Sequence, residues 1–309
     1  MRRTLVALVG VTASGKTAVG ERVAEIVRGA VVCADARQVF RELELGTGKP
    51  TPDERARLPH RLFDLLALGE RATAGRWARA AADACEQLFA DGITPVLVGG
   101  SGLYVSALER GLHPEPPQDA ALRARLEHDW SALGAEAMHG KLAELDPHAA
   151  GTLGVRDRQR VLRALELVTA GGRPLASWRE RPREAPLAAE WRTFQLTCPP
   201  ATLAARIAAR TQAMWEQGLL EEVRGLVAAG KADALKRLAA IGYDEALDVL
   251  EGRLSGDAAR ERTNQRTRQL AKRQRTWFRH QIAAEPVDVS QWEADGEAIA
   301  RGIARSLAS

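Results

Sequence analysis

Gly10-Val-Thr-Ala-Ser-Gly15-Lys16-Thr17 is the stretch of this sequence that decides the fold. It satisfies the pattern GxxxxGK[ST] in full, with an apolar run, Leu5–Val9, before it and a helical pattern, Gly15–Arg28, after it. Glycines in such a loop let backbone N–H groups turn toward phosphate oxygens, while the lysine adds positive charge and the Thr17 hydroxyl can ligate magnesium. The sequence therefore predicts a phosphate or pyrophosphate site with magnesium as its cofactor. The residues expected to hold the phosphates are Gly10, Val11, Thr12, Ala13, Ser14, Gly15, Lys16 and Thr17.

Strand and helix patterns alternate downstream of this loop. Val31–Ala34 and Pro95–Val98 read as short buried strands, and a helix is expected from the N-cap Thr73 to Gly92. Such alternation is typical of a parallel sheet with its ligand site at the carboxyl ends of the strands. The predicted fold class is therefore α/β, a P-loop NTPase-like core with a parallel sheet flanked by helices.

A second, all-helical part interrupts this core. His113–Pro117 breaks the alternation, residues 119–180 show only helical periodicity, and Trp191–Thr197 looks like a returning strand. Helices are expected from Ala201 to the end. The predicted organisation is a P-loop α/β core at 1–113 and 187–309, which ends in basic helices, and a helical insertion domain at 114–186.

Composition excludes several other classes of protein. The 309 residues are 45% hydrophobic and 27% charged, which argues against intrinsic disorder. The isolated cysteines Cys33, Cys85 and Cys198 form no disulfide or zinc pattern and suit a reducing cytoplasm. The opening MRRTLVALVG imitates a short secretory signal, but it leads directly into the glycine motif and is expected to be an interior strand. No apolar run approaches the roughly 20 residues that cross a bilayer, so no membrane association is expected.

Asp35 is the acidic residue that the pattern places nearest to the phosphate loop. A P-loop ATPase normally holds magnesium with a carboxylate at the end of a neighbouring strand, and the strand Pro95–Val98 ends in Gly-Gly-Ser-Gly without one. The strand Val31–Ala34 does lead into a carboxylate, Asp35. Two interpretations of Asp35 stay open on spacing alone: a functional carboxylate beside the phosphates, or a cap of the turn that follows the strand.

Positive charge is concentrated near the C-terminus. Arg260–His280 contains seven arginines and one lysine against one glutamate, a net charge of +7, so the other 288 residues carry −3 of the total +4. Arg268, Lys272, Arg275 and Arg279 follow helical spacing along one stripe. A stripe of a single sign favours a polyanion such as a nucleic-acid backbone or a pyrophosphate.

The insertion adds a weaker signal of the same kind. Arg156, Arg160 and Arg163 are spaced i, i+4, i+7 and would form another basic helical face, although acidic residues elsewhere in the insertion temper it. Three function classes are compatible with these patterns: a transferase that acts on RNA, an ATP-dependent small-molecule kinase, and a nucleotide-gated RNA-binding protein. The missing carboxylate after Val98 and the basic stripe weigh against the kinase, and Asp35 weighs against the pure binder.

The order of motifs resembles that of bacterial tRNA dimethylallyltransferases, also called tRNA isopentenyltransferases. Besides the P-loop, the matching segments are Asp35-Ala-Arg-Gln-Val-Phe40, Gly46-Thr-Gly-Lys-Pro50, Gly99-Gly-Ser-Gly-Leu-Tyr104, Arg160-Val-Leu-Arg-Ala-Leu-Glu166 and Thr267-Arg-Gln-Leu-Ala-Lys-Arg-Gln-Arg-Thr-Trp-Phe-Arg279. The resemblance covers nearly the whole chain. It implies transfer of a dimethylallyl group from dimethylallyl diphosphate to the exocyclic amine of the tRNA adenosine that is 3′-adjacent to the anticodon.

The resemblance also implies roles for individual residues. Asp35 would be the base, Ser101 would orient Asp35 or the amine, Lys16 would stabilise the leaving pyrophosphate, and Gln38 would read the adenine edge. The partners would be dimethylallyl diphosphate and a tRNA anticodon stem-loop, a monomer being the simplest assembly. The residues expected to contact tRNA are Asp35, Ala36, Arg37, Gln38, Ser101, Arg123, Gln159, Arg160, Val161, Leu162, Arg163, Arg266, Arg268, Lys272 and Arg273.

Overall fold

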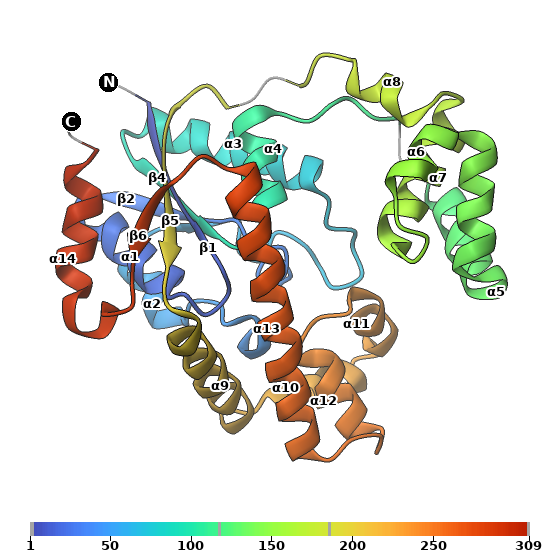
Figure 1. Ribbon diagram of the computed structural model, residues 1–309. Helices are drawn as coiled ribbons and strands as arrows, with labels where there is room; N and C mark the ends of the chain where they lie inside the picture. The colour runs from blue at the N-terminus through green and yellow to red at the C-terminus, as the bar shows by residue number, and fades with distance from the viewer. Residues whose placement is uncertain (1–2, 117–118, 185–186, 308–309) are drawn as a thin grey trace. The chain divides into compact units, whose positions relative to one another are not determined.

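The computed structural model describes residues 3–116, 119–184 and 187–307, and it divides the chain into two compact units (Figure 1). Unit 1 comprises Met1–Glu109 and Leu187–Ser309, and unit 2 comprises Arg110–Pro186. The break expected at His113–Pro117 ends on a residue, Pro117, that lies outside the described ranges.

Unit 1 is built on one six-stranded sheet in the order β3-β2-β4-β1-β5-β6, and all of its strand pairs are parallel. The prediction of a parallel α/β sheet is confirmed. The P-loop follows β1, in the middle of the sheet, at the carboxyl end where parallel sheets place their ligands. The strands are β1 (Thr4–Gly10), β2 (Gly29–Cys33), β3 (His60–Arg61), β4 (Thr94–Gly99), β5 (Glu190–Thr197) and β6 (Glu285–Asp288).

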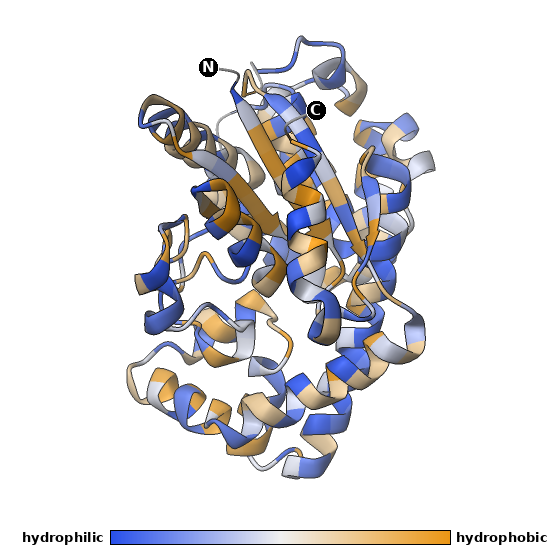
Figure 2. Cartoon of the chain, turned by 90° about the vertical axis from the view of Figure 1, so that its left-hand side faces the viewer, coloured by the Kyte–Doolittle hydropathy of each residue, from blue (hydrophilic) through white to orange (hydrophobic). Residues whose placement is uncertain are grey.

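Helices cover both faces of this sheet, which explains why β1 is apolar without interruption from Leu5 to Val9. Leu5, Ala7 and Val9 pack into one hydrophobic cluster with α3 and α4, while Val6 and Leu8 pack into another with α1 and α14. Figure 2 shows the resulting pattern of hydrophobic strands among helices with hydrophilic outer faces. The helices of unit 1 are α1 (Lys16–Val27), α2 (Pro52–Arg57), α3 (Ala74–Ala90), α4 (Gly102–Arg110), α9 (Pro200–Glu216), α10 (Leu219–Ala228), α11 (Ala232–Leu238), α12 (Tyr243–Leu250), α13 (Gly256–Gln281) and α14 (Trp292–Arg305), with a 3₁₀ turn at Leu45–Thr47.

The sequence patterns missed three short elements and overextended the C-terminal helices. β3 has only two residues, and β6 reads Glu-Pro-Val-Asp, so neither carries an alternating apolar pattern. The expectation of uninterrupted helices after Ala201 is wrong at β6, which adds an edge strand beside β5. The third missed element is α2, which begins at Pro52 behind a Thr51–Glu54 capping box.

Unit 2 is a separate helical layer with its own core. Its described residues form four helices and no strand, as the helical periodicity predicts: α5 (Ala120–Leu145), α6 (Pro147–Thr152), α7 (Arg158–Gly171) and α8 (Leu175–Arg179). The Asp157 side chain caps α7 by accepting a hydrogen bond from the Arg160 backbone N–H at 3.2 Å. Because α7 begins after that cap, Arg156 precedes the helix, and the predicted basic face of Arg156, Arg160 and Arg163 is wrong at its first member.

Across the described ranges, we find no helix that combines the length and the apolar character needed to cross a membrane.

Candidate active site

The phosphate loop connects β1 to α1 through a turn that glycine makes possible. Gly15 has a φ of +87°, a left-handed conformation that residues with a Cβ adopt only with strain. Gly15 is also the N-cap of α1 and has no side chain to satisfy the first backbone N–H groups of the helix. Those N–H groups and the positive end of the helix dipole form an anion site at the carboxyl end of β1.

Lys16 is held at this anion site by the loop itself. Its Nζ donates a hydrogen bond to the Val11 carbonyl oxygen at 2.6 Å. Burial lowers the pKa of Lys16 to about 8, the negative charge of Asp35 acts in the opposite direction, and the Arg210 charge lowers this pKa further. The ammonium is therefore poorly solvated, and a bound phosphate would supply the charge that it lacks.

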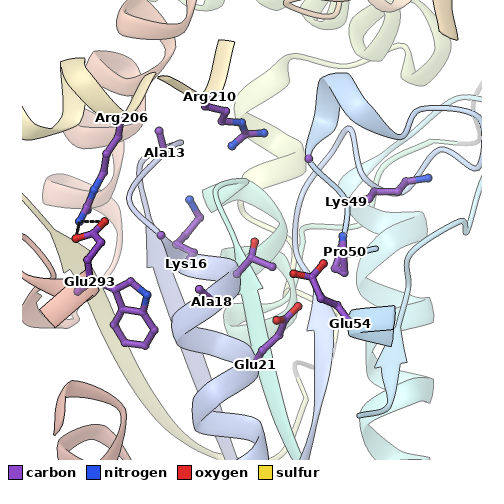
Figure 3. A pocket seen from close by; sticks show the side chains of 14 residues that line it. Ala13, Lys16, Ala18, Glu21, Lys49, Pro50, Glu54, Arg206, Arg210 and Glu293 are labelled. Carbon is purple, nitrogen blue, oxygen red and sulfur yellow. Dashed lines mark hydrogen bonds and ion pairs between the residues drawn. The ribbon is translucent and has the colours of Figure 1, made fainter. Parts of the chain in front are cut away.

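A cavity of about 430 Å³ opens beside the loop (Figure 3). Lys16 and Thr17 line it from α1, Arg210 lines it from α9, and Trp292 and Glu293 line it from α14. Cationic groups and free N–H groups at a concave site next to a helix N-terminus suit a ligand with several negative charges. Four of the eight predicted phosphate-binding residues, Ala13, Gly15, Lys16 and Thr17, line this cavity, which is large enough for a small diphosphate.

Arg210 is a site residue that the sequence analysis missed. Its guanidinium donates a hydrogen bond to the Thr47 carbonyl oxygen at 2.8 Å and lines the cavity together with Lys16. Burial lowers the pKa of Arg210, and the Asp35 charge counteracts that effect. The available signal was Arg206 and Arg210 at i, i+4 on the helix after β5. Helical spacing alone does not tell which part of the fold such a pair of side chains faces.

Asp35 lies in the turn that follows β2, and both interpretations of it describe part of what is observed. Its Oδ1 accepts hydrogen bonds from the backbone N–H groups of Arg37 at 2.8 Å and Gln38 at 3.4 Å, which is the turn-capping role. Its charge also acts on Lys16 and Arg210, so the carboxylate is electrostatically part of the phosphate site. The cap fixes the orientation of a carboxylate whose charge acts on two cations of the cavity.

Ser101 lies between β4 and α4, directly before Gly102, and holds the Asp35 turn. Its Oγ accepts a hydrogen bond from the Ala36 backbone N–H at 2.9 Å, and its own N–H donates to the Ala34 carbonyl oxygen at 3.1 Å. These two bonds lie on either side of Asp35 in the chain. Ser101 thus contacts backbone groups of the turn. Among the described residues, no hydrogen bond joins the Ser101 hydroxyl to the Asp35 carboxylate.

Gln38 uses its amide within the protein. Nε2 donates to the carbonyl oxygens of Thr47 at 3.1 Å and Gly48 at 2.9 Å, which ties the Asp35 turn to the segment Gly46–Pro50. Lys49, within that segment, anchors it: the buried Nζ donates a hydrogen bond to the Phe40 carbonyl oxygen at 2.6 Å. Since both amide hydrogens of Gln38 are engaged, bidentate reading of an adenine would require these bonds to be exchanged.

The oxygen donors around Thr17 suit a magnesium ion that is shared with a phosphate. Thr17 lines the cavity, and the carboxylates of Glu21 and Glu54 lie on the same wall (Figure 3). Mg²⁺ prefers such hard oxygen ligands and keeps several waters. The described residues contain no group of three or more His, Cys, Asp or Glu side chains that could hold a metal by themselves, so the phosphate oxygens would have to complete the ligand set.

The basic residues of α13 differ in how far they are exposed. Arg268, Lys272 and Arg273 are exposed, and Arg268 also pairs with the exposed Glu261 at 3.0 Å. Arg266 differs, because its Nη1 lies 2.5 Å from the fully buried Glu245 carboxylate and 2.9 Å from Asp244. Of the four residues on this helix that were expected to contact tRNA, three are therefore accessible and one is committed to α12.

The predicted RNA contacts of unit 2 divide in a similar way. Gln159 and Arg160 are exposed on the first turn of α7. Arg123 and Arg163 both pair with the buried Glu166 carboxylate, at 3.5 Å and 2.9 Å. The side chains of the next two residues, Val161 and Leu162, are fully buried in the core of unit 2, which leaves only their backbone for the predicted RNA contact.

The fold and this cavity define the chain as a P-loop α/β protein with a cationic cavity beside its phosphate loop. Family models agree and are more specific: the model described as IPP transferase matches residues 38–281, and the one described as isopentenyl transferase matches residues 3–64. The chain belongs to the IPP transferase family.

Similar proteins are known from sequence and from solved structures. The chain is 41% identical to the tRNA dimethylallyltransferase of Geobacter sulfurreducens, over 92% of this chain and 91% of the relative. The tRNA isopentenylpyrophosphate transferase of Bacillus halodurans superposes with a TM-score of 0.68 at 30% identity, covering 99% of this chain and 98% of that one. A eukaryotic dimethylallyltransferase solved while acting on tRNA gives a TM-score of 0.80 at 25% identity, covering 98% and 78%.

Proposed function

We propose that this chain is a tRNA dimethylallyltransferase. It transfers a dimethylallyl group from dimethylallyl diphosphate to the exocyclic amine of the adenosine 3′-adjacent to the anticodon in tRNA, and it releases pyrophosphate. The observation that carries the proposal is the pairing of an anion cradle with a carboxylate: Lys16 and Arg210 line the cavity at the phosphate loop, and the Asp35 turn is hydrogen-bonded to Ser101 beyond the neighbouring strand β4. The Asp35 charge acts on both cations. Family membership supports the same reaction.

The reaction forms one bond and breaks one. The amine nitrogen attacks the allylic carbon next to the diphosphate, the carbon–oxygen bond breaks, and its electron pair leaves with the pyrophosphate. The amine proton passes to the Asp35 carboxylate, for which general-base catalysis typically contributes about 10²–10⁴-fold. The backbone N–H bonds to Asp35 Oδ1 hold the carboxylate in place for this step.

The leaving group is stabilised by fixed positive charge. Lys16, Arg210 and the first N–H groups of α1 all lie at the cradle, where low solvent exposure strengthens each interaction. We propose that Thr17 and the diphosphate oxygens hold a magnesium ion, which would neutralise charge that develops on the pyrophosphate. Ser101 holds the Asp35 turn through the Ala36 backbone N–H, which makes it a positioning residue in this scheme.

Two exposed basic surfaces are proposed to bind the RNA. One is on α13, with Arg268, Lys272 and Arg273, and the other is the start of α7, with Gln159 and Arg160. Phosphate contacts of this kind supply affinity, whereas we expect the base to be selected at the turn that carries Asp35, Arg37 and Gln38. An extruded loop base costs less to place than a base in a duplex.

We further propose that the chain acts as a cytoplasmic monomer. The free thiols Cys33 and Cys85 are buried, which suits a reducing compartment. One phosphate site and one catalytic carboxylate suffice to modify one RNA, so a single chain is enough.

Label transfer tests the function against its competitors. The chain is incubated with dimethylallyl diphosphate or ATP, each labelled, with and without a tRNA anticodon stem-loop. We expect label in the RNA only from dimethylallyl diphosphate, with equimolar pyrophosphate released. ATP turnover on a small acceptor would support a kinase instead, and RNA binding that responds to nucleotide without any transfer would support a gated binding protein.

A further inference from the structure

Gln274 is a half-buried side chain of α13 that contacts both loops of the site. Its Oε1 accepts a hydrogen bond from the Thr12 backbone N–H in the phosphate loop at 2.8 Å. Its Nε2 donates to the Gly100 carbonyl oxygen, just after β4, at 3.0 Å. One amide therefore connects two loops that are separated in the sequence by almost ninety residues.

The Gly100 bond extends to the turn that carries the proposed base. Ser101 follows Gly100 directly and accepts the Ala36 N–H at its Oγ, 2.9 Å away. The same residue donates its own N–H to the Ala34 carbonyl oxygen at 3.1 Å. Thr12, Gln274, Gly100, Ser101 and the Asp35 turn thus form one continuous hydrogen-bonded path from the leaving-group cradle to the carboxylate.

Close packing fixes this amide in its position. A Cβ on Gly100 would lie 2.4 Å from Gln274 Nε2, so the absence of a side chain there is what admits the amide. One helical turn further along α13, the Trp277 ring packs against Gly102, on the other side of Ser101. Two side chains of the basic helix therefore hold the Gly100–Gly102 turn.

We propose that Gln274 is a positioning residue that fixes the phosphate loop and the Asp35 turn relative to each other. The inference rests on the proposed function, in which the diphosphate occupies the loop and Asp35 takes the amine proton. An amide is suited to this position because it accepts from a backbone N–H and donates to a backbone carbonyl at the same time. No ionised or purely apolar side chain of this length makes both bonds.

The first test removes both bonds and keeps the volume. Gln274→Met should weaken binding of inorganic pyrophosphate by roughly tenfold, the effect of losing one or two part-buried hydrogen bonds. It should also lower the turnover rate by roughly ten- to a hundredfold, because the reacting groups lose their alignment. Gln269→Met is the matched control, since Gln269 is an exposed glutamine of the same helix, and both values should stay within about twofold of the wild type.

The second test restores the bonding pattern with a proton. In Gln274→Glu, an ionised carboxylate still accepts from Thr12 but repels the Gly100 carbonyl oxygen, whereas a protonated carboxyl donates to that oxygen as the amide does. The pyrophosphate affinity of Gln274→Glu relative to wild type should therefore recover as the pH falls toward the range in which a glutamate protonates.

The two tests separate this inference from the proposed function. Pyrophosphate titrations decide the role of Gln274 whether or not the chain transfers a dimethylallyl group to RNA. An unchanged pyrophosphate affinity in Gln274→Met, or a Gln274→Glu variant whose ratio to wild type does not depend on pH, would overturn the inference. If Gln274→Met does not fold, the pH dependence of Gln274→Glu decides alone.

Discussion

Lys16 and Arg210 bring two poorly solvated cations to one cavity, with one carboxylate, Asp35, acting on both. Lys16 and Asp35 could be predicted from sequence, because a phosphate loop and a strand-end acid each have a recognisable local pattern. Arg210 and Gln274 could not, because each reaches the site from a helix whose orientation is set by packing far along the chain. Val161 and Leu162 show the limit of a continuous motif: the segment Gln159–Arg163 was predicted to contact RNA, yet two of its five side chains lie in a core.

The lowered pKa of Lys16 predicts how diphosphate binding depends on pH. With a pKa of about 8 in the free protein, binding above that value must take up a proton, so affinity should fall by up to about tenfold per pH unit. Below about 8 this group should cause no change. The check is calorimetric titration of pyrophosphate from pH 7 to 10 in buffers of different ionisation enthalpy.

Lys16→Met is the control for that titration. It should bind pyrophosphate weakly and lack the proton uptake above pH 8, which leaves only the titration of the ligand itself. In the wild type, the lowered pKa also means that the folded protein binds the Lys16 proton more weakly than the unfolded chain, in which the pKa of this lysine is 10.5. The free energy of unfolding of the wild type should therefore rise between about pH 8 and pH 10.5. Equal proton uptake in both proteins would mean that Lys16 is not the titrating group.

Helix α13 combines three roles on different faces. Gln274 and Trp277 contact the site loops, Arg266 pairs with α12, and Arg268 and Lys272 are exposed. The stripe of positive charge could be predicted from helical spacing, since that spacing depends on the sequence alone. The pairing of Arg266 could not, because its acidic partners lie on a different helix. The short strands β3 and β6 were missed for a related reason: the sheet recruits them by edge pairing, not by an apolar pattern of their own.

Removing exposed charge from α13 should weaken RNA binding in a salt-dependent way. Arg268→Ala combined with Lys272→Ala should lower affinity for a tRNA anticodon stem-loop and reduce the slope of log K against log salt by about two. The affinity is measured over a series of salt concentrations. Arg301→Ala combined with Arg305→Ala removes two charges from α14 and should leave the slope unchanged; an equal loss there would mean that the effect is one of net charge.

Arg266 belongs to stability rather than to RNA binding. Arg266→Ala leaves the buried Glu245 carboxylate with fewer partners and should lower the free energy of unfolding by about 2 kcal/mol, less than for a fully buried pair because Arg266 is partly exposed. Denaturant unfolding measures this effect, and the exposed Arg273→Ala on the same helix should change stability by less than about 0.5 kcal/mol. If Arg266→Ala is as stable as the wild type but binds RNA more weakly, Arg266 contacts the RNA.

At the scale of the whole molecule, the chain consists of an α/β unit interrupted by a helical one. The interruption could be predicted because periodicity changes from strand and helix to helix alone, and because prolines mark the first junction. The sequence pattern does not show how the two segments of unit 1 meet on either side of the insertion. In the structure the Leu187 backbone N–H donates to the Leu108 carbonyl oxygen at 3.0 Å, so the two segments of unit 1 are joined directly to each other.

This geometry predicts that unit 1 tolerates loss of unit 2. Replacing residues 110–186 with a short glycine-serine linker should leave a folded protein that binds pyrophosphate as the full chain does. Its affinity for the anticodon stem-loop should fall by at least about tenfold, because the exposed residues at the start of α7 are gone. Circular dichroism and the two binding titrations check this, and loss of pyrophosphate binding would mean that unit 1 depends on the insertion.

The role of Asp35 is the central claim, and a single-turnover transfer assay with Asp35→Asn tests it most directly. The substitution keeps the size of the side chain and an oxygen for the Arg37 N–H but removes the base. With dimethylallyl diphosphate and an anticodon stem-loop at saturation, and with modified adenosine quantified by mass spectrometry of the digested RNA, we predict a loss of at least about a hundredfold in rate. Binding of RNA and of pyrophosphate should persist, and the exposed Asp91→Asn should behave as wild type. Wild-type transfer by Asp35→Asn would contradict the account.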